Sequence, residues 1–174
     1  MDMVRAGPIG DITESKTDIH WDEKGHTKIS HIFVSFNSSY IISIQFGYFE
    51  NGALVMSAKY GGPSKGQNFR VVKLKHNEYV TGFSGVVVTA WGGRLLSINS
   101  LIFYTNLGKH GPICDLVPKF SNATSTKKEI DMTICDRLDF GGFFGSCDEA
   151  KLKSIGIYVT PTPSSDAVVK RENV

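Results

Sequence analysis

Charged side chains of both signs crowd the stretch Asp148-Glu-Ala-Lys-Leu-Lys153, which lies directly before the apolar run Ile155–Val159. Carboxylates accept hydrogen bonds and ammonium groups donate them, so a loop of this composition could hold a polar ligand. The apolar run is rich in Ile, Tyr and Val, which is typical of a strand. The stretch therefore predicts a possible ligand loop that leads into a strand, with one helical turn at most.

Other residues that could do chemistry are not arranged for it. The five histidines show no metal-ligand spacing with cysteine or acidic partners, and the three cysteines form no C-x-x-C pair. The glycine-rich segment 61–68 lacks the spacing of a phosphate-binding loop, so a β-turn connection is expected there. Nothing resembles a nucleophile elbow or paired catalytic carboxylates. We therefore expect a protein that is not an enzyme, with no catalytic residues, no metal and no cofactor.

Composition limits the partners and the compartment. The chain has 174 residues, enough for one domain, with 19 basic and 17 acidic residues and a net charge of +2. This balance does not favour nucleic acid or a membrane surface as partner. Cys114, Cys135 and Cys147 are too few and odd in number for a disulfide framework, and residues 1–16 contain no apolar run. We expect free thiols and a cytoplasmic location.

Short β-rich runs separated by turn signals predict an all-β fold. The expected strands cover residues 31–36, 40–48, 69–75, 85–90, 98–105 and 155–159. No convincing helix is present. The last residues, 161–174, are rich in Pro and Ser and then charged, so we expect a flexible tail after a domain of residues 4–160.

A weak internal repeat points to threefold organisation. The pattern Ser-[Ile/Leu]-x-apolar begins at Ser43, Ser100 and Ser154, with spacings of 57 and 54 residues. Each copy opens or continues an apolar strand. Three units of about fifty residues predict three similar sheets around a pseudo-threefold axis.

An ordered set of motifs across residues 4–160 resembles the jacalin-related lectin family, in its mannose-type branch. The motifs include GPIG at 7–10, HWDEKGHTKISHIFVSF at 20–36, YGGPSKG at 60–66 and GGFFGSCDEAKLKSIGIYV at 141–159. The resemblance implies a β-prism, three four-stranded Greek-key sheets around a pseudo-threefold axis. It also implies carbohydrate binding, without a metal, where three loops meet at one end of the prism.

The resemblance places the family's sugar-binding loop at Glu149, Ala150, Lys151, Leu152 and Lys153. The family's acidic acceptor falls on Lys153, and its two glycines fall on Glu149 and Asp18. An ammonium cannot accept the two sugar hydroxyls that a carboxylate accepts. We therefore expect a degraded sugar site of the mannose or glucose type.

Two tryptophans lie near these loops. Trp91 falls in the family's second site loop, where it could stack on a sugar ring or pack on its own hairpin, and these two alternatives stay open. Trp21 is expected to be a core residue. An alternative function is a protein-interaction or antiviral defence factor on a lectin scaffold, with a protein partner or a second copy of the chain. A defence role is expected under either reading.

Overall fold

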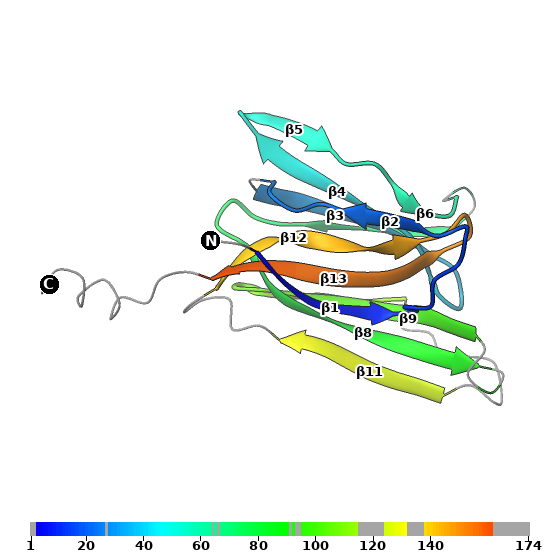
Figure 1. Cartoon of the computed structure of the whole chain (residues 1–174). Helices are drawn as coiled ribbons and strands as arrows, with labels where there is room; N and C mark the ends of the chain where they lie inside the picture. The colour runs from blue at the N-terminus through cyan, green and yellow to red at the C-terminus, as the bar shows by residue number, and fades with distance from the viewer. Residues whose placement is uncertain are drawn as a thin grey trace, which may run out of the picture.

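The computed structural model describes residues 3–26, 28–63, 65, 67–90, 92, 95–114, 124–131 and 138–161. Within these residues the chain forms thirteen strands and no helix. The strands build three antiparallel sheets that run along one long axis, with the first and last described strands side by side (Figure 1). The all-β expectation is confirmed.

The first sheet joins the two ends of the chain. It has the order β1-β13-β12-β2. Its strands are β1 (Val4–Gly10), β13 (Leu152–Pro161), β12 (Leu138–Cys147) and β2 (Ile19–Asp22). Because β1 pairs with β13, the connections that follow β1 and precede β13 leave the sheet at the same end.

The second and third sheets come from continuous stretches of chain. The second has the order β5-β4-β3-β7, with β6 pairing on β4 beyond β5. Its strands are β3 (Lys28–Phe36), β4 (Ile41–Glu50), β5 (Ala53–Met56), β6 (Tyr60–Gly61) and β7 (Asn68–Lys73). The third has the order β10-β9-β8-β11. Its strands are β8 (Val80–Ala90), β9 (Leu95–Thr105), β10 (Gly108–Ile113) and β11 (Thr124–Asp131).

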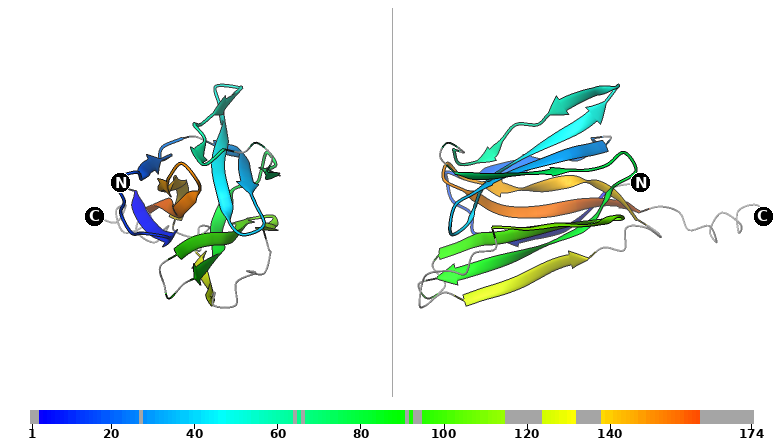
Figure 2. Two further views of the ribbon diagram at one scale, coloured as in Figure 1. Left: turned by 90° about the vertical axis from the view of Figure 1, so that its right-hand side faces the viewer. Right: turned by 180° about the vertical axis from the view of Figure 1, so that it is seen from behind.

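The three sheets enclose one core, as the end-on view shows (Figure 2). Phe143 of β12 lies at its centre and is fully buried. Its ring stacks on Phe46 at 5.2 Å and meets Phe83 and Phe103 edge-on at 6.1 and 5.7 Å between ring centroids. Phe143 therefore contacts an aromatic ring from each of the other two sheets. The prediction of three four-stranded sheets is confirmed, with one difference. In the second sheet, two short strands, β5 and β6, pair with β4 at the position of a single edge strand.

The serine repeat corresponds to a structural repeat. Ser154 lies opposite Gly10 and Ser43 lies opposite Gly61, and both glycines have positive φ, 113° and 123°. In the third sheet, Cys114 follows the Leu101–Ile113 pair and also has positive φ, 64°. The same left-handed position thus ends the edge strand in each unit, which glycine adopts most easily.

Six strands were expected from the sequence, and all six are present, most of them longer than predicted. Trp21 is buried and stacks on Tyr60 at 4.8 Å, so its core role is confirmed. The other seven strands were not predicted, among them the inner strand β12, whose sequence is rich in Gly and Phe and does not alternate. The flexible tail beyond Pro161 lies outside the described residues and stays a prediction.

Replacing Phe143 by Ala should lower the free energy of unfolding by about 3–5 kcal/mol, since it removes a buried ring and leaves a cavity. The midpoint of thermal unfolding should fall by about 10 °C for a chain of this size. Phe69→Ala, on the exposed face of β7, is the matched control and should cost less than about 1 kcal/mol. Denaturant unfolding of both variants measures these changes in unfolding free energy. Equal decreases for the two variants would contradict the assigned core.

Candidate functional site

Three connections meet at one end of the prism, on the right in Figure 1. They are residues 11–18 between β1 and β2, residues 148–151 between β12 and β13, and the hairpin between β8 and β9. This is the arrangement that the resemblance implied. Trp91, in the hairpin, lies outside the described residues.

Asp148, the first residue of the 148–151 connection, holds this connection in a tight turn. Asp148 Oδ1 accepts hydrogen bonds from the backbone N–H groups of Ala150 and Lys151, both at 2.8 Å. The Asp148 N–H donates to the Lys151 carbonyl at 3.1 Å. An Asx turn of this kind is a stable local structure. Its consequence is that two backbone donors of the loop are already used within the loop.

Neighbouring connections hold the same loop from both sides. The Lys151 ammonium reaches across to the Leu96 carbonyl at 2.7 Å, which ties the loop to the start of β9. On the other side, Gly62 lies so close to Ala150 that an added Cβ would overlap the Ala150 carbonyl oxygen. The loop is therefore fixed in place at this end of the prism.

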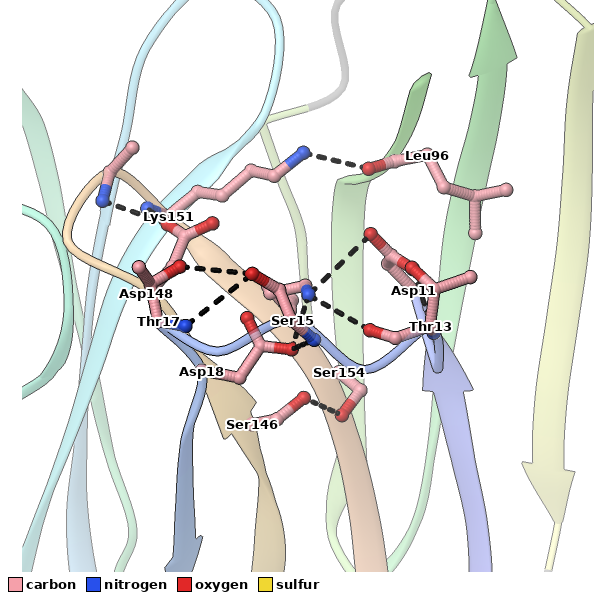
Figure 3. Close-up of polar contacts among 12 residues, drawn as sticks. Asp11, Thr13, Ser15, Thr17, Asp18, Leu96, Ser146, Asp148, Lys151 and Ser154 are labelled. Atoms are coloured by element: carbon pink, nitrogen blue, oxygen red, sulfur yellow. Dashed lines mark hydrogen bonds and ion pairs between the residues drawn. The ribbon is translucent and has the colours of Figure 1, made fainter. Parts of the chain in front are cut away.

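Lys153 and Asp18 are joined in a buried ion pair. The Lys153 Nζ lies 2.6 Å from Asp18 Oδ2, and the two side chains are 5% and 4% exposed. The ammonium also donates to the Thr13 carbonyl at 3.0 Å and lies 3.9 Å from Asp11 Oδ2. Figure 3 shows Asp11, Thr13 and Asp18 gathered around one point where these dashed lines converge. Two of the three N–H donors of the ammonium are therefore used in hydrogen bonds to protein oxygens, and the Asp11 carboxylate adds a longer charge contact.

The ion pair changes the acidity of Asp18. The hydrogen bond from Lys153 lowers the pKa of the Asp18 carboxyl below its usual 3.8, and burial opposes this only in part. Asp18 Oδ2 also accepts from the Ser15 N–H at 2.9 Å. Its other oxygen is buried and has no hydrogen-bond partner among the described residues. Removing either partner would leave the remaining charge buried without compensation.

A cavity of about 490 Å³ lies beside the ion pair, against the first sheet and the β1–β2 connection. Thr13, Asp18 and His20 line it, together with Ser146 and Ser154. The two serine hydroxyls hydrogen-bond each other at 2.6 Å (Figure 3). A small polar molecule would therefore approach Asp18 from this side.

The structure brings together two of the residues expected at the site, Asp18 and Lys153, by direct contact. Glu149 and Ala150 lie on the exposed part of the loop, whereas Leu152 is fully buried in the core cluster. Sequence reasoning did not assign a role to Asp148. An Asp at the start of a short polar connection is a turn signal that could have identified it.

The part of the chain that the structure describes holds no group of three His, Cys, Asp or Glu side chains placed to bind a metal ion. Cys114 and Cys147 in this part are both buried. No helix long and apolar enough to cross a membrane was found among the described residues.

Three antiparallel sheets around one axis, with connections meeting at one end, define the class of β-prism proteins. Residues 7–158 match the family model described as the jacalin-like lectin domain. The chain belongs to this family. Membership confirms the expectation of a binding protein rather than an enzyme.

Among curated relatives, the chain is 48% identical over 164 residues to jacalin-related lectin 24 of Arabidopsis thaliana, covering 92% of this chain and 69% of the relative. It is 38% identical to jacalin-related lectin 25 of the same plant, covering 99% of this chain and 63% of that one. It is also 34% identical to the Arabidopsis protein RESTRICTED TEV MOVEMENT 1, covering 91% and 87%.

Solved structures share the fold. A mannose-binding jacalin-related lectin from Ananas comosus superposes with a TM-score of 0.68 at 22% identity, covering 91% of this chain and 98% of that one. The artocarpin–mannotriose complex gives 0.69 at 23% identity, covering 92% and 99%. At these identities the likeness establishes the β-prism.

Asp18→Asn should lower the free energy of unfolding by about 3 kcal/mol at neutral pH, because it leaves the buried Lys153 ammonium with only the more distant Asp11 carboxylate, 3.9 Å away, as counter-charge. The folded pKa of Asp18 is depressed, so its contribution is present above the unfolded value and is lost as pH falls through the folded value. The difference between wild type and variant should therefore shrink on acidification below about pH 4. Denaturant unfolding at several pH values measures it.

Glu149→Gln is the matched control for that experiment, since Glu149 is an exposed carboxylate of the same segment, three residues before the buried Leu152. It should change the unfolding free energy by less than about 0.5 kcal/mol at every pH. If the difference in unfolding free energy between wild type and Asp18→Asn stays constant with pH, the assigned ion pair is contradicted.

Proposed function

We propose that this protein is a carbohydrate-binding lectin whose site at the loop end is degraded, so that free mannose, glucose or galactose binds weakly. The observation that supports the proposal is the buried contact between Lys153 and Asp18. The ammonium stands where the family resemblance expects a carboxylate acceptor, and it is already bonded to protein oxygens.

The sugar class comes from the similar structures. One is described as a mannose-binding lectin and another is a complex with mannotriose. We extend mannose or glucose type recognition to this chain as part of the proposal. A defence role belongs to the same proposal and rests on the similarity to RESTRICTED TEV MOVEMENT 1. A cytoplasmic location also belongs to it and rests on the sparse, odd number of cysteines.

The expected loss of affinity follows from hydrogen bonding. A carboxylate that accepts from two sugar hydroxyls forms charge-assisted bonds, which are stronger than neutral ones. Losing this acceptor should cost about 2–3 kcal/mol, roughly a hundredfold in affinity. The Asx turn adds to this effect, because Asp148 already accepts from the N–H groups of Ala150 and Lys151.

The dissociation constants of wild type for mannose, glucose and galactose should exceed about 10 mM by isothermal titration. The triple variant Asp18→Gly, Glu149→Gly and Lys153→Asp should bind mannose or glucose measurably, since it supplies an acceptor and clears two acidic side chains. Lys153→Asp alone should bind much less, because the new carboxylate would face Asp18 and Asp11 without a cation.

Near-UV circular dichroism must show that each variant is folded. Sub-millimolar binding of a monosaccharide by wild type would overturn the degraded site. A folded triple variant that binds no sugar on a glycan array would show that the loop is not a latent site, and would favour the second candidate function.

That second candidate is protein interaction on a lectin scaffold, in which a partner binds away from the sugar site. A specific observation favours it: large apolar side chains are exposed on the second sheet, among them Phe69, Leu54 and Met56. The similarity to RESTRICTED TEV MOVEMENT 1 is consistent with a defence setting for such a partner.

A further inference from the structure

The outer face of the second sheet is apolar. Strand register places Phe33 opposite Val71, and His31 opposite Lys73 and Gly47, so these residues share one face. Gly47 lies opposite Met56. The other face of the same strands carries Ile32, Val34, Ile44 and Phe46, all of them fully buried. The alternation shows that the first set points away from the core.

Several side chains on this outer face are strongly exposed. Phe69 is 57% exposed, Leu54 49%, Val71 43% and Met56 42%. The rings of His31 and Phe33 stack at 5.7 Å and those of Phe33 and Phe69 at 6.0 Å, so the aromatic part is continuous. The β4–β5 hairpin carries the aliphatic part and stands away from the body of the prism (Figure 2). Contiguous apolar surfaces of this kind mark interaction sites.

Close packing over Gly47 joins the two parts. A Cβ built on Gly47 would lie 3.2 Å from His31 Cβ, 3.2 Å from Leu54 Cδ1 and 3.4 Å from Met56 Sδ. Side chains of β3 and β5 therefore meet over the glycine of β4. The outer face therefore carries apolar side chains on both β7 and β5, joined by His31 and Gly47, with the polar Gln45 beside Phe33.

One end of this face is a groove of about 350 Å³ with basic walls. Lys28, Lys73 and Lys75 line it, with His31 and His76, around Phe49 and Leu74. The groove lining contains no carboxylate. The three ammonium groups have no ion-pair partner within the residues that the structure describes. A ligand for this groove must therefore combine negative charge with apolar side chains.

We propose that the outer face of β3, β4, β5 and β7 binds an acidic segment of a partner protein, one that alternates apolar side chains with carboxylates. The apolar side chains cover Phe33, Phe69 and Met56, and the carboxylates enter the groove and pair with the lysines. This deepens the second candidate function and is independent of sugar binding.

Other occupants fit the face less well. A second copy of the chain would bring the same lysines together around the groove, which is unfavourable. A bilayer is flat and cannot fill a groove of this depth. Nucleic acid would use the aromatic rings, but its bases gain little from the aliphatic side chains Leu54, Val71 and Met56.

Selection of a displayed library of short random peptides on the full-length protein tests the proposal. Selected peptides should be enriched in Asp and Glu together with Phe, Leu, Ile and Val. Fluorescence polarisation with a selected peptide should show at least about a tenfold loss of affinity for Phe69→Ser and for Lys73→Glu/Lys75→Glu. Lys109→Glu, an exposed lysine change on β10, is the matched control and should bind as wild type does. Binding should weaken as salt rises.

Several results would overturn the proposal. One is a peptide selection that enriches no peptides, or that enriches peptides without acidic residues. Another is a dimer in solution that Phe69→Ser converts to monomer. Equal or tighter binding to phosphatidylserine vesicles or to single-stranded RNA oligonucleotides would assign the face to those partners instead. If Phe69→Ser is not folded by circular dichroism, the lysine variant decides the result. Monosaccharide titrations of the same variants should match wild type, so failure here is distinct from failure of the sugar-site proposal.

Discussion

The buried ion pair between Lys153 and Asp18 determines how the loop end of the prism is built. Lys153 is the second residue of β13 and Asp18 ends the β1–β2 connection, 135 positions apart in the chain. Their contact at 2.6 Å ties the N-terminal connection to the last strand, and the Thr13 carbonyl adds a third point of attachment. Separating the two buried charges would cost free energy, because each would remain buried without its partner of opposite charge. The same contact that fixes the loops also commits the Lys153 ammonium and one oxygen of Asp18 to each other.

Behind the loop end, the aromatic core keeps the three sheets in register. Phe143 contacts Phe46, Phe83 and Phe103, so one strand of the first sheet touches both other sheets. The left-handed positions at Gly10, Gly61 and Cys114 end the edge strands at equivalent places. A rigid frame of this kind lets loops and outer faces vary in sequence without a change of fold. The connections at the loop end and the outer face of the second sheet are two surfaces outside this frame.

Much of the fold could be predicted from the sequence because it depends on local patterns. Alternating apolar runs located six of the thirteen strands, and the spacing of Ser43, Ser100 and Ser154 indicated the threefold repeat. Family resemblance placed Asp18 and Lys153 at the same site. It could not show that they bond each other, because a side-chain contact across 135 positions depends on where the folded loops lie. The apolar outer face was also missed, since alternation alone does not tell which face of a sheet is covered.

The most direct test of the central claim is a crystal structure of the protein grown or soaked in a large excess of methyl-mannoside. The account predicts that the Lys153 ammonium remains bonded to Asp18 and the Thr13 carbonyl, and that no sugar lies between residues 11–18 and the 148–153 segment. Sugar density at that position, with the ammonium displaced from Asp18, would contradict it.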